Sequence, residues 1–269
     1  MNDKKRLPTA IVLIGILFVS IQFLPRLAFF CFIQVIILFA LFEFYNLPIK
    51  KKIFLHKTIG ILLAIIIGFS FYFDEFSLEL GLYVSLVLVG AYFVFSINKL
   101  EKLVKFPASI ALTFFGAFYL SFTLNYFVFL REERGPFIVY YLLAVIAIGD
   151  TASYFFGKLL GRHKLAPIAS PHKTWEGAVA GLPGACVAAV IIQQILLKDA
   201  VLWKVILIAC LVDIVAQISD LLESLFKRAV GVKDSSHMLP GHGGFLDRID
   251  SYILAAPFFY YLLKFIGLE

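Results

Sequence analysis

Residues 27–47 read LAFFCFIQVIILFALFEFYNL, an apolar run whose polar side chains are few and isolated. A helix rises about 1.5 Å per residue, so about 20 residues cross the roughly 30 Å of hydrocarbon in a bilayer. The length and composition of this run therefore predict a transmembrane helix. Similar runs occur along most of the chain.

The composition of the whole chain agrees with this interpretation. Of its 269 residues, 61% are hydrophobic and 16% are charged, and the mean hydropathy is +0.94. A soluble domain of this length needs more charge to cover its surface. The alternating ten-residue segments of a membrane β-barrel are not visible. We therefore predict an all-α, polytopic integral membrane protein.

Apolar runs bounded by charges, proline or glycine predict about nine transmembrane helices. They are placed near 8–24, 27–47, 58–73, 80–97, 106–130, 137–160, 177–197, 200–222 and 250–267. The short connections favour a single membrane domain over residues 1–269. Within it, residues 1–135 are expected to face lipid and pack, and residues 136–269 to form the catalytic helices and cytoplasmic loops.

The distribution of charge predicts the topology. Alternate connections hold most of the 24 Lys and Arg residues, whereas the 74–79 connection is acidic. The positive-inside rule then places the N-terminus in the cytoplasm and the C-terminus outside. We expect a multi-pass protein of the cell (inner) membrane, with its polar loops facing the cytoplasm. The net charge of +6 is read as a contact with the lipid bilayer, with no nucleic-acid partner.

The first half of the chain has few residues that suggest chemistry. Glu43 lies near a predicted cytoplasmic end and is expected to face the membrane interface. Cys31, Cys186 and Cys210 lie in apolar runs, and none is at metal-ligand spacing from another. They are interpreted as packing thiols.

The 200–222 span carries a polar stripe in its second half. Asp213, Gln217, Asp220 and Ser224 return to within about 40° of one another on a helix of 3.6 residues per turn. Glu223 lies to one side of this stripe. Two acids on one stripe repel each other, and at low dielectric they stay ionised only beside a cation.

Further carboxylates are expected at the same membrane surface. Asp150 interrupts the 137–160 span, and an acid at that depth costs at least ~2.5 kcal/mol. A structural salt bridge would also explain Asp150. Asp247 and Asp250 precede and open the last span. Oxygen ligands of this kind suit Mg²⁺, which takes one or two carboxylates together with substrate phosphate.

Two predicted cytoplasmic connections supply positive charge. The first spans 161–177 and the second 224–250, where glycines interleave with cations and allow backbone N–H groups to approach an anion. An anionic-lipid anchor would explain each cation alone. It does not explain why acids, cations and glycines share the same short segment. The pattern predicts a cradle for phosphate and metal where a lipid head group meets the cytosol.

The second connection also carries a specific motif. SLFKRAVGVKDSSHMLPGHGGFLDRID (224–250) resembles the C-terminal signature of the phosphatidate cytidylyltransferases, the CDP-diacylglycerol synthases of phospholipid biosynthesis. GDTASYFFGKLLGRHKL (149–165) and SPHKTWEG (170–177) are also typical of that family. The resemblance covers roughly residues 145–260. One departure is His172, which stands where the family usually has a second basic residue before Lys173.

The resemblance implies a nucleotidyltransferase that converts phosphatidate and CTP to CDP-diacylglycerol and pyrophosphate. It also implies one or two Mg²⁺ ions and a homodimer. The expected catalytic residues are Asp220, Asp247, Lys227, Arg228, Lys233, Arg248, His242 and Asp250. The expected substrate-binding residues are Lys173, Ser170, Thr174, Gly243, Gly244, Lys164 and Ser224. The expected metal ligands are Asp220, Asp247, Asp150 and Glu223.

Two other functions fit parts of the pattern. One is a related enzyme, either a CTP-dependent polyprenol kinase or a cytidylyltransferase that acts on ether lipids, because the apolar spans carry no readable code for a lipid tail. The other is an ion-coupled transporter with Asp150, Asp213 and Asp220 as its relay. Transporters usually show repeated halves, whereas here the polar residues concentrate in the second half.

Overall fold

The computed structural model describes residues 3–47, 57–236, 238 and 243–268. Among them, seven helices are long and apolar enough to cross a membrane, and Ile11–Phe23 and Lys57–Phe69 are shorter apolar helices. The prediction of an all-α polytopic membrane protein is confirmed. The chain divides into two compact units, Met1–Val128 with Asp234–Arg248, and Phe129–Lys233 with Ile249–Glu269. Residues 234–248, the larger part of the 224–250 motif, therefore belong to the same unit as the N-terminal helices.

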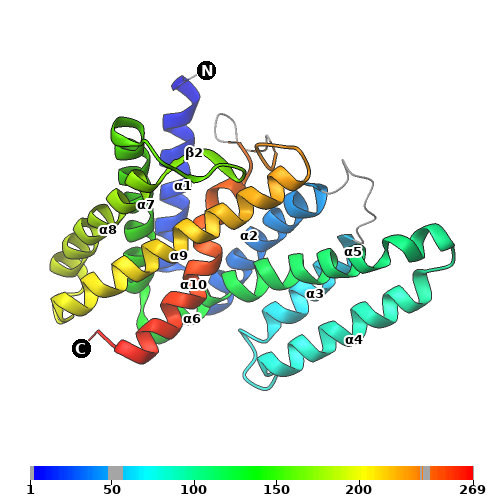
Figure 1. Ribbon diagram of the computed structural model, residues 1–269. Helices are drawn as coiled ribbons and strands as arrows, with labels where there is room; N and C mark the ends of the chain where they lie inside the picture. The colour runs from blue at the N-terminus through cyan, green and yellow to red at the C-terminus, as the bar shows by residue number, and fades with distance from the viewer. Residues whose placement is uncertain (1–2, 48–56, 237, 239–242, 269) are drawn as a thin grey trace. The chain divides into compact units, whose positions relative to one another are not determined.

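The first unit contains the N-terminal helices (Figure 1). They are α1 (Asp3–Phe23), α2 (Arg26–Asn46), α3 (Lys57–Phe69), α4 (Leu78–Ser96), α5 (Leu100–Ala117), the π-helical turn η2 (Phe118–Phe122) and the start of α6 (Tyr126–Arg134). Figure 1 shows α3, α4 and α5 side by side. The N-terminus of α4 is capped by Ser77, whose hydroxyl accepts a hydrogen bond from the backbone N–H of Leu80.

The core of the first unit is built around a buried tyrosine. The Tyr45 ring fills the space that Gly60 of α3 and Gly116 of α5 leave open, since a Cβ atom on either glycine would lie within 2.6 Å of that ring. Its hydroxyl donates a 2.6 Å hydrogen bond to the backbone oxygen of Thr113. The hydroxyl therefore has a partner inside an apolar core, as a buried polar group requires.

Isolated polar residues of the first half also pair with one another. Gln34 Nε2 of α2 donates a 2.7 Å hydrogen bond to Asn125 Oδ1, and Asn125 Nδ2 donates to the backbone oxygen of Ser121 at 2.8 Å. Ser121 Oγ in turn donates to the backbone oxygen of Ala64 on α3 at 2.6 Å. These contacts lie at the π-helical turn, where the backbone departs from regular α-helical bonding.

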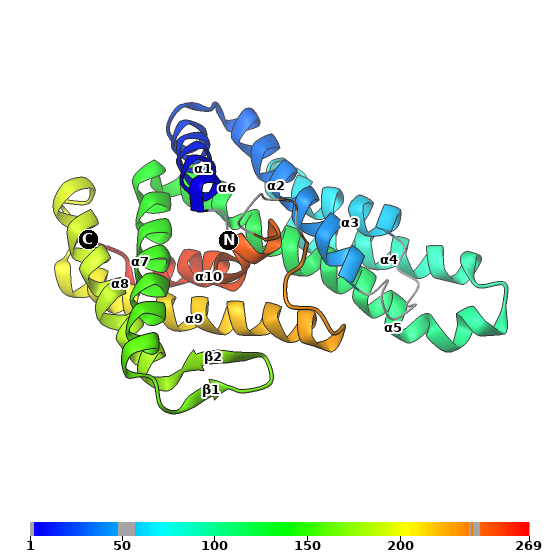
Figure 2. The same ribbon diagram turned by 90° about the horizontal axis from the view of Figure 1, so that it is seen from above.

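The second unit consists of long helices and one small β-hairpin. Its elements are α7 (Pro136–Leu160), β1 (Lys164–Ala166), β2 (Ser170–Thr174), α8 (Trp175–Leu196), α9 (Leu202–Ala229) and most of α10 (Leu246–Ile266). The two strands are antiparallel, with Lys164 opposite Thr174. Figure 2 shows the hairpin extending from the end of α7 and running along α9.

Small residues allow α7 and α8 to pack closely. A Cβ atom on Gly177 of α8 would lie 2.9 Å from the Cα of Gly157 on α7 and 2.7 Å from the backbone oxygen of Ser153. The two backbones are therefore in direct contact at this point, as is common where small residues line a transmembrane helix interface. The contact lies in the last turn of α7 and the first turn of α8, the two helices that the β-hairpin connects.

Several helices extend beyond the predicted spans. The predicted 106–130 span is part of a continuous helical run, Leu100–Arg134. The predicted 200–222 span continues to Ala229, and the last helix begins at Leu246 instead of residue 250. The predicted spans were too short because they were ended at charged residues. Lys227 and Arg228 suit the last turn of a helix, and Asp247 suits a first turn. These three residues are helical and do not lie in loops.

Candidate functional site

The β-hairpin of the second unit is attached to α9 by two cations. Lys173 on β2 forms an ion pair with Asp220 Oδ2, and the two side chains are 29% and 21% exposed. Arg228 Nε donates a 3.1 Å hydrogen bond to the backbone oxygen of Ala169 in the hairpin turn, and its Nη1 donates to the backbone oxygen of Val232 at 3.0 Å. The hairpin lies along the C-terminal part of α9 as a result (Figure 2).

A glutamate that was not predicted closes the base of this hairpin. The Glu176 carboxylate accepts hydrogen bonds from the backbone N–H groups of Arg162 at 3.0 Å and of His163 at 3.2 Å. It also lies 2.6 Å from His163 Nδ1. Thr174 is buried and its hydroxyl accepts from the backbone N–H of Gly177, so it caps α8. An acid in the first turn after a threonine cap is the sequence signal for such an anchor.

Asp150 on α7 lies beside the Lys173–Asp220 pair. Its Oδ2 accepts a 3.0 Å hydrogen bond from Ser251 Oγ of α10. It is near enough to Lys173 and Asp220 for their charges to interact. Three helices and the hairpin thus bring carboxylates and an ammonium group together, which is the mixture predicted for phosphate and metal.

The predicted stripe on α9 is confirmed. Asp213 is fully buried, and its Oδ2 accepts a 2.7 Å hydrogen bond from Gln217 Nε2. Ser224 Oγ donates to Asp220 Oδ1 at 3.4 Å. The second oxygen of Asp213 has no hydrogen-bond partner among the described residues. A Cβ atom on Gly149 of α7 would lie 2.1 Å from it, so the glycine makes room for this carboxylate.

One turn beyond Asp220, two further predicted residues pair with each other. Lys227 and Glu223 form an ion pair whose side chains are only 9% and 1% exposed. Asp250 lies near enough to both for their charges to interact. Its Oδ1 accepts a 2.7 Å hydrogen bond from the backbone N–H of Ser251, and its backbone oxygen accepts from Ser219 Oγ. Glu223 was expected to bind a metal, and it is instead bonded to a buried ammonium group.

In the first unit, Asp247 stands at the start of α10 and is bonded to the signature segment. Its Oδ2 accepts hydrogen bonds from the Ser235 backbone N–H and hydroxyl, both at 3.0 Å. The Gly244 backbone N–H donates to the same oxygen at 2.9 Å. Gly243, with a φ of +81°, has the left-handed backbone that glycine adopts without strain. Both glycines therefore serve the backbone around Asp247.

Glu43 was expected at the membrane interface, and this expectation is wrong. Glu43 is only 1% exposed. Its carboxylate accepts hydrogen bonds from the segment that carries Asp247. The donors are the hydroxyls of Ser235 and Ser236 and the backbone N–H groups of Phe245 and Leu246. A carboxylate is buried in this apolar helix because the folded chain supplies these donors.

The remaining predicted residues lie as follows. Lys164, Lys233 and Arg248 are exposed, Ser170 is half-buried, Ser224 is buried, and His242 lies outside the described residues. Asp247 belongs to the first unit and Asp220 to the second. Their predicted convergence on one metal ion stays a prediction.

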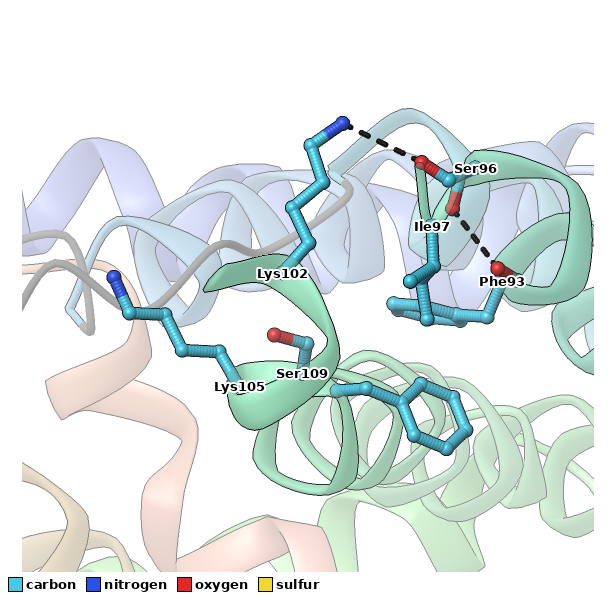
Figure 3. A pocket seen from close by; sticks show the side chains of 7 residues that line it. Phe93, Ser96, Ile97, Lys102, Lys105 and Ser109 are labelled. Atoms are coloured by element: carbon cyan, nitrogen blue, oxygen red, sulfur yellow. Dashed lines mark hydrogen bonds between the residues drawn. The ribbon is translucent and has the colours of Figure 1, made fainter. Parts of the chain in front are cut away.

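A pocket of about 130 Å³ lies in the first unit, between the end of α4 and the start of α5 (Figure 3). It is lined by Phe93, Ser96, Ile97, Lys102, Lys105, Phe106 and Ser109. Lys102 Nζ lies 3.4 Å from the backbone oxygen of Ser96, and Lys105 pairs with Glu101 at 3.2 Å. Pockets for ligands the size of a nucleotide measure about 300–1,000 Å³. This pocket is too small for a nucleoside triphosphate and contains none of the predicted site residues.

Comparison with known proteins gives consistent results along the chain. Residues 4–266 match the model of the cytidylyltransferase family. A phosphatidate cytidylyltransferase of Bacillus subtilis (strain 168) is 32% identical over 98% of this chain and 98% of its own length. One of Staphylococcus haemolyticus is 32% identical over 97% of this chain and 98% of its own. One of Brucella suis biovar 1 is 42% identical over 54% of each chain.

Proposed function

The chain belongs to the cytidylyltransferase family, and we propose that it transfers the cytidylyl group of CTP to phosphatidate. The products are CDP-diacylglycerol and pyrophosphate. The observation that carries this proposal best is the Lys173–Asp220 pair with Asp150 beside it. This group combines an ammonium group that can bind phosphate with carboxylates that can bind a metal ion. It lies in a helical membrane protein whose relatives are named phosphatidate cytidylyltransferases.

The reaction requires little acid–base chemistry from the protein. The phosphomonoester of phosphatidate has a second pKa near 6, so it is largely dianionic at neutral pH. One of its oxygens attacks the α-phosphorus of CTP. A new P–O bond forms there as the bond to the β-phosphate breaks, and the electron pair leaves with pyrophosphate. The protein's task is to align two anions that repel each other and to offset the charge on the leaving group.

The chain supplies cations for this task. Lys173 is partly exposed and touches a carboxylate, so it can contact a phosphate held beside that carboxylate. Arg228 holds the hairpin turn against α9, and Lys233 lies exposed a few residues further on. Arg248, on the first turn of α10, is proposed as a further phosphate contact. Lys227 is buried against Glu223, and it supports the site through that pair.

The carboxylates fit Mg²⁺, although no group of three or more His, Cys, Asp or Glu side chains that could hold a metal ion is found in the described ranges. Mg²⁺ needs only one or two carboxylates, because waters and substrate phosphate complete its shell. The Asp220 side chain is 21% exposed and offers two oxygens. We propose Asp220, Asp247 and Asp150 as ligands. Bound Mg²⁺, as one or two ions, would offset the negative charge of the triphosphate.

Glu223 is less suited than Asp220 to bind a metal ion. Its carboxylate is almost fully buried and paired with Lys227, so a metal ion would have to displace an ammonium group from an interior site. Asp250 is proposed to support the α9–α10 contact, where its backbone oxygen accepts from Ser219.

The setting of the enzyme is also proposed. The bias of Lys and Arg toward alternate connections supports a multi-pass protein of the cell (inner) membrane, with its active site facing the cytoplasm. A homodimer follows from the family resemblance alone. Cross-linking of detergent-solubilised protein at several protein concentrations would test the dimer.

The experiment that tests the function follows labelled CTP into lipid. Purified protein in mixed micelles is given CTP labelled in the cytidine or, in a parallel assay, in the γ-phosphate, together with Mg²⁺ and one lipid at a time: phosphatidate, its ether-linked analogue or a polyprenol. We expect label in a lipid extract with phosphatidate. Label with the ether lipid alone, or transfer of the γ-phosphate to polyprenol, would replace this proposal with the related enzyme.

A further inference from the structure

We propose that Glu43, on α2, is a positioning residue that holds Asp247 in place for metal binding. The inference rests on the proposed function, in which Asp247 is a ligand of Mg²⁺. It assigns a role in the reaction to the half of the chain whose sequence shows almost no chemistry.

Each of the two oxygens of the Glu43 carboxylate accepts two hydrogen bonds. Oε1 accepts from the Ser236 hydroxyl at 2.5 Å and from the Phe245 backbone N–H at 2.9 Å. Oε2 accepts from the Ser235 hydroxyl at 2.9 Å and from the Leu246 backbone N–H at 2.7 Å. Each oxygen thus accepts from one serine hydroxyl and one backbone N–H group. Only a carboxylate offers two acceptor oxygens in this arrangement, since an amide side chain has one.

Two of these bonds fix the start of α10. The first N–H groups of a helix have no partner within the helix, and negative charge near that end is favourable. Such groups are usually capped by a residue next to the helix in sequence. Here the acceptor comes from α2, far away in the chain, so Glu43 anchors the first turn of α10, which includes Asp247, to another helix of the same unit.

A third bond leads directly to Asp247. Ser235 Oγ lies 2.9 Å from Glu43 Oε2 and 3.0 Å from Asp247 Oδ2. One hydroxyl thus stands between the two carboxylates. A Cβ atom on Gly244 would lie 1.7 Å from Ser235 Oγ and within 2.9 Å of both carboxylate oxygens. The three side chains therefore close around Gly244, and the orientation of Asp247 depends on where Glu43 holds Ser235.

Residues that hold a metal ligand in position affect metal affinity, and their loss typically costs 10–100-fold. The test measures turnover against Mg²⁺ concentration, and also direct Mg²⁺ binding by isothermal titration calorimetry without substrate, for Glu43→Gln and Glu43→Asp. Glu43→Gln keeps the size of the side chain and loses two of the four acceptor bonds, so the half-saturating Mg²⁺ concentration should rise about 10–100-fold. Glu43→Asp keeps both oxygens on a shorter stem and should recover part of this loss.

The matched control is Glu133→Gln. Glu133 Oε1 accepts a 2.7 Å hydrogen bond from the Tyr260 hydroxyl in the second unit, and it is not part of the proposed site. This variant should keep the Mg²⁺ requirement of the wild type. A merely structural loss at Glu43 would reduce the amount of folded protein and leave the half-saturating Mg²⁺ concentration unchanged.

An unchanged Mg²⁺ requirement in Glu43→Gln would overturn the inference. If Glu43→Gln does not fold, Ser235→Ala decides, because it removes the link between the carboxylates and leaves three bonds to Glu43. It should raise the half-saturating Mg²⁺ concentration about 5-fold, and a wild-type value would again overturn the inference. Asp247→Asn separates the two proposals: wild-type Mg²⁺ dependence in that variant would refute the metal assignment itself, whatever Glu43 does.

Discussion

The ammonium group of Lys173, on the short strand β2, pairs with the carboxylate of Asp220 on the transmembrane helix α9. This pair joins the β-hairpin to the polar stripe that begins with the buried Asp213. It places the cation proposed to bind phosphate in contact with a proposed metal ligand.

Replacing Lys173 with alanine should lower kcat/KM for CTP about 100-fold, because one charge that would face developing phosphate charge is removed. The measurement is pyrophosphate release at saturating phosphatidate. Lys158→Ala removes an exposed lysine from the last turn of α7 and should retain wild-type kinetics. Equal losses in the two variants would indicate a general effect of charge and refute a specific role of Lys173.

Glu176→Gln should loosen the base of the hairpin. The amide keeps one acceptor oxygen for two backbone N–H groups and the His163 ring, so at least one of these contacts is lost. Trypsin should then cleave after Arg162 or Lys164 faster than in the wild type. The control is Glu101→Gln, because Glu101 is 75% exposed. Unchanged cleavage in Glu176→Gln would contradict the anchor.

Gly149→Ala should destabilise the second unit. The added Cβ atom would lie 2.1 Å from Asp213 Oδ1, and such overpacking typically costs about 1–3 kcal/mol. Gly90→Ala is the matched control, because a Cβ atom there meets nothing within 4 Å, and alanine favours a helix over glycine by roughly 0.5–1 kcal/mol. Thermal unfolding in detergent should separate the two variants in opposite directions. Similar unfolding midpoints in the two variants would refute the close contact between Gly149 and Asp213.

Cys186 and Cys210 should form a cross-link between α8 and α9. Their sulfurs lie 3.3 Å apart, whereas a disulfide needs about 2.05 Å, so a small approach suffices. A hydroperoxide would take two electrons and two protons from the thiols and become alcohol and water. Of three free thiols, one should then remain, on Cys31. If alkylation still labels all three cysteines after the wild type is oxidised, the helix contact is wrong.

Much of the fold was predictable from local patterns. Hydrophobic length identifies helices such as α2 because the bilayer fixes the number of residues needed to cross it. The spacing of Asp213, Gln217 and Asp220 predicts one stripe because helical periodicity is local. Helix ends were missed at Lys227 because a charge that ends an apolar run can still belong to the last helical turn.

Other features could not be predicted because they depend on contacts between distant residues. Nothing near Glu43 indicates that its partners are Ser235 and Leu246, and burial of a lone acid appears costly until those donors are known. The hairpin was missed because β1 has three residues and β2 has five, too few to show the alternation of a strand. The anchor at Glu176 could not be predicted for the same reason, because its carboxylate accepts hydrogen bonds from Arg162 and His163 at the other end of the hairpin.

The central proposal is that Asp220 and Asp247 are both ligands of the Mg²⁺ that the proposed transfer requires. The most direct measurement is phosphatidate-dependent pyrophosphate release during a Mg²⁺ titration, in the wild type, Asp220→Asn, Asp247→Asn and the double variant. We predict that each single variant loses at least about 100-fold and that the double variant is little worse, because the residues act as a unit. Wild-type turnover and Mg²⁺ dependence in either folded single variant would contradict the claim.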